Sequence, residues 1–450
     1  MRLADWTRGH RGAFVAAAAL FVVTFLWLYP APVLLSHQGR QSLLTAQSLN
    51  AGYGFEVTPE IPFAKFGPFY PLILAFLGRL GLGVGPAVHL INCAAFAGAM
   101  LGLHALCRFV GVRRPLVALA LYGSLAANTL LLRSARPDLI VVCAATLALV
   151  AFVAYAQRPT MSALFAAAVC SSVAATSRYV AVLALLPMIL VALWLAGGSW
   201  RTRVRDLTIF GSIAAGPVLL WMARNYRVTG FLTGMSRTKV RRVAPEEFDL
   251  WEQLRGMLST IWIDVFSPDS LGLRRIVYRG GELDYQAIMI GATVIAGSAA
   301  FGLVWFRRRE LAAFCSAQAR RRTVAFHAVV LVASYVVLYT LVLIVVWSLS
   351  NNDPIHTRYV SPLYGYLIVL ASLAVTVATD GGPRRLRLLP ALICLSIAAP
   401  NLPKTARLLG HERPPRALVT VQEFGDHGNA WVRDLEWGSL DEIRPRRPGG

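Results

Sequence analysis

Acidic residues are scarce in this chain of 450 residues, which has 23 Asp and Glu against 44 Lys and Arg. Between Asp5 and Asp138 the only acids are Glu56 and Glu60. The six cysteines form no Cys-x-x-Cys pair, so neither a zinc ribbon nor a disulfide framework is indicated. Short motifs for dinucleotide, phosphate-loop, zinc-protease and serine-hydrolase sites are also missing. These absences exclude the enzyme classes that such motifs identify.

Long apolar runs dominate the sequence, with 56% hydrophobic residues and a mean hydropathy of +0.56. A helix that crosses the hydrocarbon needs about 18 or more apolar residues. The runs predict an all-α integral membrane protein with about eleven transmembrane helices and juxtamembrane helices at the outer face. The predicted crossings are 13–29, 86–109, 115–132, 139–156, 161–176, 179–197, 207–223, 286–306, 324–347, 361–379 and 388–400.

Arginine clusters recur after alternate apolar runs, for example at 108–114 and 201–205. Short loops rich in Lys and Arg stay on the cytoplasmic side, so the N-terminus is predicted to be cytoplasmic. The run 67–82 is short, aromatic and carries Pro68, Pro71 and Arg79, which predicts a segment along the outer interface. If it crossed instead, every later cluster would be inverted. The net charge of +21 is explained by this topology and by anionic lipids rather than by nucleic acid.

These crossings and their sidedness predict one transmembrane domain over residues 1–400. We expect this domain in the inner (plasma) membrane. Its outer loops are expected at 30–85, 224–285 and 348–360. An amphipathic helix beginning near Pro245 is expected on the outer membrane surface. Residues 401–450 form a short, polar extracytoplasmic tail in this scheme.

Several cations fall on the predicted outer side, where charges near the membrane are costly and point to function. A cationic pocket there suits a phosphate or diphosphate group, and the alternative is that some of these side chains anchor the protein in the interface. The main candidates are Lys65, Arg136, Arg178, Arg224 and Arg358. Asp138, at the mouth of a helix, is either a helix-start residue or a functional acid. His37 and His356 are too distant in sequence to indicate a metal site.

Four segments give the chain a resemblance to a known family. The segments are Leu43–Phe55, which looks like a juxtamembrane helix, Ala64–Leu72, Trp221–Gly230 with its Trp-x-x-Arg-Asn-Tyr pattern, and Arg358–Leu363. With these four segments in this order, the chain resembles the GT-C superfamily of polyprenyl-phosphate-sugar glycosyltransferases. The superfamily includes aminoarabinose-lipid A transferases and protein O-mannosyltransferases.

The resemblance implies an inverting sugar transfer from a lipid phosphate to an envelope acceptor at the extracytoplasmic face. A carboxylate would activate the acceptor hydroxyl, and cations would stabilise the departing phosphate. Lys65 matches the family lysine that contacts the lipid phosphate. The implied partners are a polyprenyl-phosphate sugar, membrane lipid and an acceptor that the sequence does not identify.

One position departs from the family pattern. Gln38 stands where members carry an acid, so the base is expected to be Asp138, then Glu60, then Glu56. Otherwise the chain has lost the chemistry and is a non-catalytic, lipid-linked-sugar binding or scaffold protein. Ala64 stands where the aminoarabinose enzymes have a metal-binding acid, so no metal ligand is assigned and a divalent cation stays open. A transporter is a third interpretation, although no internal repeat supports it.

Overall fold

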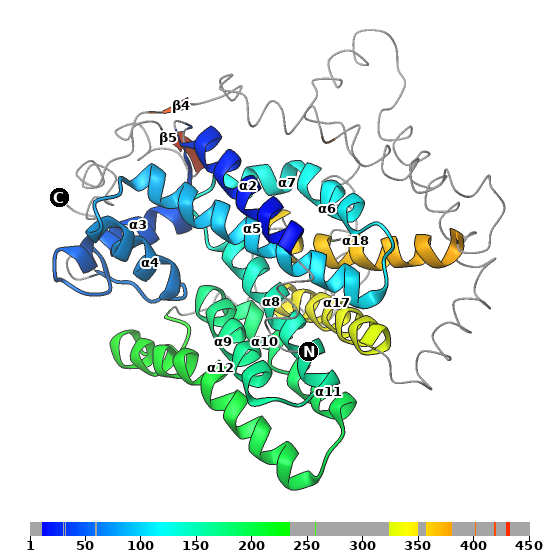
Figure 1. The fold of residues 1–450 in the computed structure, drawn as a ribbon. Helices are drawn as coiled ribbons and strands as arrows, with labels where there is room; N and C mark the ends of the chain where they lie inside the picture. Colours follow the sequence, from blue (N-terminus) through cyan, green and yellow to red (C-terminus); the bar gives the residue numbers. More distant parts are fainter. Residues whose placement is uncertain are drawn as a thin grey trace, which may run out of the picture.

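The computed structural model describes residues 11–29, 31, 33–58, 61–234, 324–349 and 357–379, with short pieces at 257, 401, 418–419 and 429–432. Most of the described chain is helical (Figure 1). The helices are α2 (Arg11–Leu28), α3 (His37–Asn50), α4 (Phe69–Arg79), α5 (Val84–Val110), α6 (Pro115–Ser124), α7 (Ala126–Leu132), α8 (Asp138–Gln157), α9 (Met161–Ser177), α10 (Tyr179–Leu185), α11 (Met188–Ala196), α12 (Trp200–Thr229), α17 (Val324–Leu349) and α18 (Thr357–Thr379). The strands are β1 (Val33–Ser36), β2 (Glu56–Thr58), β3 (Ile61–Pro62), β4 (Leu418–Val419) and β5 (Asn429–Val432).

The prediction of a multi-pass helical membrane protein is confirmed. Within the described residues, 6 helical segments are long and apolar enough to cross a membrane. They are Val84–Val110, Asp138–Gln157, Tyr179–Ala196, Trp200–Thr229, Val324–Ile344 and Val360–Val377. Other apolar helices, among them α2, α6 and α9, are shorter than a full span. The predicted crossings 286–306 and 388–400 and the amphipathic helix near Pro245 lie outside the described residues.

Two predicted continuous crossings are interrupted in the structure. The run 115–132 forms α6 and α7, because Leu125 between them has an extended backbone with φ −64° and ψ 123°. The run 179–197 forms α10 and α11, with Pro187 directly before α11. Proline has no backbone N–H and cannot continue the helical hydrogen-bond pattern.

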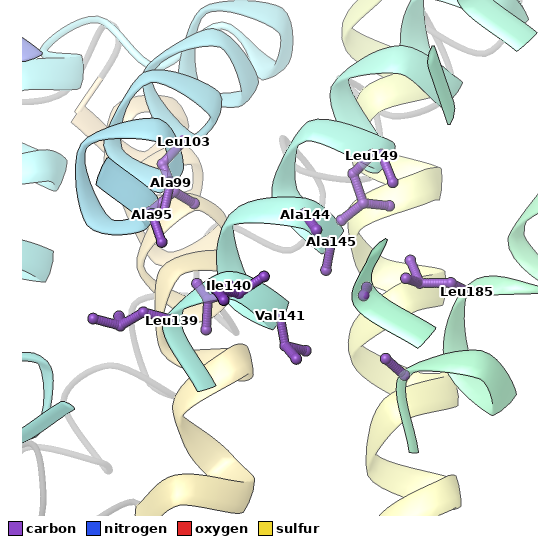
Figure 2. Close-up of a cluster of buried hydrophobic side chains, with 14 of the residues drawn as sticks. Ala95, Ala99, Leu103, Leu139, Ile140, Val141, Ala144, Ala145, Leu149 and Leu185 are labelled. Carbon is purple, nitrogen blue, oxygen red and sulfur yellow. The ribbon is translucent and has the colours of Figure 1, made fainter. Parts of the chain in front are cut away.

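Helix α8 forms the centre of the core and packs against α5, α9, α11 and α17. Its buried side chains include Leu139, Ala145 and Leu149, which Figure 2 shows in one cluster with residues of α5 and with Leu185. Small residues on α5, such as Ala95 and Ala99, let the two backbones approach closely, as is typical of helices in membranes.

Contacts at the two ends of α8 show which ends of the neighbouring helices lie together. Its first residue, Asp138, pairs with Arg178, which stands between α9 and α10. Its last residue, Gln157, hydrogen-bonds through Nε2 to Nδ1 of His327 in the first turn of α17, over 2.6 Å. A helix of 20 residues is about 30 Å long. The turn before α10 and the start of α17 therefore lie at opposite ends of the bundle.

The two ends differ in chemistry and are named for it. The loop end is the one that contains Asp138 and Arg178, and it carries α3, α4 and the strands β1 to β3. The arginine end is the opposite one, where Arg113 follows α5, Arg158 follows α8 and Arg201 begins α12.

Helix α18 also begins at the loop end. Helix α17 starts at the arginine end and finishes at the loop end, and α18 begins at Thr357 after a short link, as antiparallel neighbours do. The Oγ1 atom of Thr146 on α8 lies 2.9 Å from the hydroxyl of Tyr366 on α18, with each residue about two to three turns into its helix. The backbone of Arg358, in the first turn of α18, is thereby placed at the loop end.

A small sheet joins the two ends of the sequence, which the all-α prediction did not include. Strand β1 pairs antiparallel with β5, from Val33 opposite Val432 to Ser36 opposite Asn429. Strand β4 then pairs parallel with β5. In Figure 1, β5 lies next to the segment that leaves α2. Part of the tail 401–450 therefore contacts the loop end directly.

Candidate functional site

Strand β1 locks the turn before α8 onto the start of α3. The amide of Leu34 donates to the carbonyl of Arg133 over 2.7 Å, and the amide of Ala135 donates back to Leu34 over 3.0 Å. A Cβ atom on Gly39, in the first turn of α3, would collide with the carbonyl oxygen of Ala135. Only glycine permits this approach, so α3 and the turn form one rigid unit.

The Ser36 hydroxyl links this unit to Arg136, a candidate phosphate-binding residue. Its hydroxyl caps α3 by accepting the amide of Gly39 over 3.1 Å. The same oxygen accepts a hydrogen bond from Nε of Arg136 over 2.8 Å. Gln38, at the position where the resemblance places an acid, is buried in the first turn of α3.

Asp138 and Arg178 form an ion pair at the loop end. Nε of Arg178 lies 2.9 Å from Oδ1 of Asp138, with side-chain exposures of 13% and 1%. Oδ2 of Asp138 has no hydrogen-bond donor in the part of the chain that is described. Burial, helped by the charge of Asp138, raises the pKa of the Tyr70 hydroxyl on α4, which places this ring near the carboxylate.

The loop that carries Lys65 is held through its backbone from both sides. Nδ2 of Asn225 donates to the carbonyl of Ala64 over 3.0 Å. Nε1 of Trp221 donates to the carbonyl of Phe66 over 3.2 Å. Because α12 holds the carbonyls before and after Lys65, it sets the position of the Lys65 backbone from which the side chain extends.

Tyr179 completes this clamp from a third element. Its hydroxyl accepts a hydrogen bond from Nε1 of Trp221 over 2.8 Å and lies 3.3 Å from the carbonyl of Phe66. Tyr179 directly follows Arg178, so the same turn holds the Lys65 loop and the ion pair. A Cβ atom on Gly67 would also collide with the carbonyl of Thr176, which shows how closely the loop packs on the end of α9.

Arg224 contacts the protein backbone through its guanidinium. Nη1 donates to the carbonyl of Phe63 over 2.8 Å, and Nη2 donates to the carbonyl of Phe55 over 3.0 Å. The guanidinium carbon also lies 4.5 Å from the ring centroid of Trp221, a cation–π distance. In this arrangement Arg224 holds the hairpin of β2 and β3 against α12.

His37, Arg40 and Lys65 gather beside the start of α3. Burial lowers the pKa of the His37 imidazole, and the charges of Lys65 and then Arg40 lower it further. Burial also lowers the pKa of Arg40. At the neighbouring turn, burial lowers the pKa of Arg133 to about 10. The loop end is therefore strongly positive even where side chains are withdrawn from water.

An apolar pocket of about 630 Å³ opens beside Arg224. Helices α4, α9 and α12 form its walls, and Arg224 and Trp221 stand at its border with the Lys65 loop. The lining residues are mostly aliphatic and aromatic, among them Phe55, Phe69, Leu72, Val173, Ile213 and Leu220. A pocket of this kind accepts a hydrocarbon chain and presents a polar contact at one end.

The structure brings most of the predicted site residues to the loop end. Asp138 pairs with Arg178, Arg136 bonds Ser36, and Arg224 bonds the carbonyl of Phe63, two residues before Lys65. Glu56 lies on β2, half-buried and within electrostatic range of Arg224. Glu60 and the side chain of Arg358 lie outside the described residues.

Sequence reasoning missed the residues that hold this site together. Trp221 and Asn225 were noticed as parts of a motif, but their hydrogen bonds to the Lys65 loop were not predicted. Tyr179 was not singled out, although its place directly after Arg178 was an available signal. Among the described residues, no three His, Cys, Asp or Glu side chains come together as a metal site.

Comparison with known proteins agrees with this architecture. No protein-family model and no curated protein sequence matches the chain. ArnT from Cupriavidus metallidurans bound to undecaprenyl phosphate aligns with a TM-score of 0.53 and 14% identity, covering 89% of this chain and 77% of that chain. ArnT from the same organism in the apo state aligns with a TM-score of 0.48 and 15% identity, over 98% and 85% of the two chains. The Saccharomyces cerevisiae protein O-mannosyltransferase Pmt1–Pmt2 complex aligns with a TM-score of 0.40 and 14% identity, over 49% and 33%.

The first of these likenesses shows the fold of the chain. The protein has a GT-C-like fold, and the resemblance in fold expected from the sequence is confirmed.

Proposed function

We propose that the protein transfers a sugar from a polyprenyl-phosphate donor to an acceptor of the cell envelope, at the membrane face away from the cytoplasm. One observation carries the proposal: buried and half-buried cations outnumber the described acids at the loop end, where Arg224 also lines an apolar pocket. The described acids at the loop end are Glu56 and Asp138. The cations there that are not exposed are Arg40, Lys65, Arg133, Arg136, Arg178 and Arg224.

This charge balance favours an anionic ligand. Withdrawing a cation from water is costly unless an opposite charge compensates it. A phosphate with several oxygen acceptors suits a group of guanidinium and ammonium donors. The pocket between α4, α9 and α12 supplies apolar surface for a prenyl chain beside these donors. The ArnT structure of similar fold is bound to undecaprenyl phosphate, a molecule with both parts.

The proposed roles follow from what each side chain contacts. Lys65 binds the donor phosphate, since its loop is fixed while its own chain is half-buried. Arg136 assists from the turn that Ser36 holds. Asp138 orients Arg178, which approaches the phosphate from the other side. Arg224 keeps the Lys65 loop in place and borders the pocket.

The start of α18 contributes Arg358 to the same group in this proposal. Its backbone lies at the loop end with Asp138. Glu56, on β2 of the hairpin before the Lys65 loop, and Glu60, which lies outside the described residues, stay candidates for the acid–base group. These fixed cations would stabilise the charge that develops on the leaving phosphate. Such electrostatic stabilisation is usually the largest contribution to the rate enhancement.

The arginine end supports the proposed sidedness. Exposed arginines gather there, and loops with solvated Arg and Lys stay in the cytoplasm. These exposed side chains are Arg108, Arg113, Arg114, Arg158, Arg201 and Arg205. With that end in the cytoplasm, the loop end and its cations face the extracytoplasmic side, where a lipid-linked sugar needs no nucleotide.

A second candidate is a protein that binds lipid-linked sugars without transferring them. The observation that favours it is Gln38, an amide buried in the first turn of α3 where the resemblance places an acid. A binding protein would keep the phosphate contacts and the pocket and would lack turnover.

Binding of undecaprenyl phosphate and transfer from labelled undecaprenyl-phosphate sugars together test the proposal. Lys65→Met removes a charged contact and should weaken undecaprenyl-phosphate binding by about 1.5–3 kcal/mol, a factor of roughly 10–100. Arg79→Met is the matched control, because Arg79 is an exposed cation of the same end that bonds the carbonyl of Leu49. Equal binding by the Lys65 variant contradicts the phosphate assignment, and binding without any transfer supports the second candidate.

A further inference from the structure

His37 is an exposed imidazole placed among the cations of the loop end. It is the first residue of α3, directly after Ser36, whose hydroxyl holds Arg136. Lys65 and Arg40 both lie close enough for their charges to act on the ring. Its side chain is exposed to solvent, in contrast to the buried amide of Gln38 next to it.

The hydrogen bond of His37 requires an unprotonated ring nitrogen. Nε2 of Gln41, one turn along α3, lies 3.2 Å from Nε2 of His37. With the amide nitrogen as donor, the imidazole nitrogen accepts this bond in the neutral tautomer that carries its proton on Nδ1. The adjacent cations lower the pKa of the ring and so favour the neutral form, which is the state of a base.

The described carboxylates at the same end are less suited to accept a proton from an acceptor. Asp138 is 1% exposed and its Oδ1 faces Arg178. A base must come within hydrogen-bond reach of the proton that it removes, which a buried paired carboxylate does not allow. Glu56 lies on β2, and its charge acts on Arg224.

We propose that His37 is the general base of the sugar transfer, in place of the carboxylate that is missing at Gln38. The assignment rests on the proposed function. The acceptor hydroxyl takes the place of the Gln41 amide at Nε2 of His37 and gives its proton to that nitrogen. The acceptor oxygen forms a bond to the anomeric carbon while the bond from that carbon to the phosphate oxygen breaks. The electron pair stays on the phosphate, which leaves as polyprenyl phosphate among Lys65 and Arg136.

The test measures the rate against pH for the purified full-length protein in lipid nanodiscs. The donors are undecaprenyl-phosphate aminoarabinose, mannose and glucose, each labelled in the sugar, and membranes of the organism of origin supply acceptors. His37→Gln should lower the transfer rate by about 100-fold or more, the usual contribution of a general base. Its binding of undecaprenyl phosphate should equal that of the unchanged protein, which also shows that the variant is folded.

His37→Glu restores a proton acceptor at the same place. It should recover part of the rate, and the acidic limb of the pH profile should move to lower pH because a carboxyl titrates below an imidazole. His104→Gln, on α5 away from the loop end, is the matched control and should leave rate and profile unchanged.

The outcomes separate this inference from the proposed function. If the unchanged protein transfers sugar and His37→Gln transfers it equally fast, His37 is not the base and the transferase assignment stands. If His37→Gln is inactive and His37→Glu recovers activity with the unchanged pH profile, His37 has only a structural role. If the unchanged protein transfers none of the three sugars, both the proposed function and the inference fail.

Discussion

Arginine side chains are exposed to solvent at one end of the helix bundle and largely withdrawn from it at the other. At the arginine end the side chains of Arg113, Arg158 and Arg201 are exposed to solvent. At the loop end Arg133 is buried, with 4% of its surface exposed, and Arg178 is 13% exposed. Exposed guanidinium groups keep their hydration, so water stabilises the charges at the arginine end. The arginines of the loop end have lost much of their hydration, and Asp138 compensates part of this for Arg178.

Each end also contains one buried aspartate, and these two residues differ in the same way. Asp206 is 2% exposed, and it receives a hydrogen bond from the hydroxyl of Tyr155. Its partner, the adjacent Arg205, is 60% exposed and remains solvated. Asp138 pairs with a half-buried arginine from another helix boundary, and its second oxygen has no described donor. The contacts of Asp206 are those of a structural anchor, and Asp138 is a residue of the proposed site.

Removing the two carboxylates should give the largest difference between the ends. Asp138→Ala leaves the half-buried Arg178 without this ion pair, at a cost of about 3 kcal/mol of stability, the lower end of the range for buried pairs. Asp206→Ala loses a hydrogen bond while Arg205 stays in water, a cost of about 1–3 kcal/mol. Denaturant unfolding in mild detergent, followed by tryptophan fluorescence, measures both. Equal losses, or a larger loss for Asp206→Ala, would remove the distinction between the two pairs.

Breaking one hydrogen bond at each end should separate binding from stability. Asn225→Leu removes the shorter of two hydrogen bonds to the carbonyl of Ala64, at a cost of about 1–3 kcal/mol, and loosens the Lys65 loop. Gln157→Leu removes the contact to His327 at the arginine end. We expect weaker undecaprenyl-phosphate binding only for the first variant, measured by titration. A similar loss of binding in both variants would mean that general destabilisation is the cause.

The strand pairing of the tail gives a smaller predicted effect at the loop end. Leu34 directs its N–H and carbonyl to the turn 133–135, so the neighbouring pair Leu35 and Ala430 carries the hydrogen bonds between β1 and β5. Ala430→Pro removes one of these ladder bonds, at a cost of about 0.5–1.5 kcal/mol. Ala430→Ser keeps the backbone bond and is the control. Amide exchange in Val33–Ser36 should become faster in the proline variant alone. Unchanged exchange would show that β5 does not support β1.

The smallest predicted effect concerns the pKa of His37. Arg40→Gln removes a cation that disfavours imidazolium, so the pKa of His37 should rise. NMR titration of ring-labelled histidine in the detergent-solubilised protein measures the shift. Arg79→Gln removes an exposed cation of α4 and should not move it. A pKa that stays in place in the Arg40 variant would show that the two side chains do not interact.

The sequence predicted the helices better than the contacts between loops. Apolar length alone located α8, α12, α17 and α18, because membrane crossing requires a minimum number of residues. Sidedness predicts Lys65, Asp138 and Arg178 on one side of the membrane, and in the structure their elements lie at the loop end of the bundle. The break at Leu125 carries no proline or glycine signal at that residue, so the run 115–132 was predicted as one helix.

Long-range polar contacts could not be predicted from local patterns. The pairing of Ser36 with Asn429 depends on residues from opposite ends of the sequence, and four-residue strands have little periodicity of their own. The clamp of Trp221, Asn225 and Tyr179 acts on backbone carbonyls, which are the same at every position and leave no mark in the sequence. Such contacts are specified by packing of the helices that carry them.

An experimental structure with bound undecaprenyl phosphate would test the difference between the two ends most directly. The account predicts the phosphate within hydrogen-bond distance of Lys65 Nζ at the loop end, with the prenyl chain in the pocket between α4, α9 and α12. A phosphate bound instead among Arg113, Arg158 and Arg201 would contradict it, because the exposed arginines would then be the functional ones.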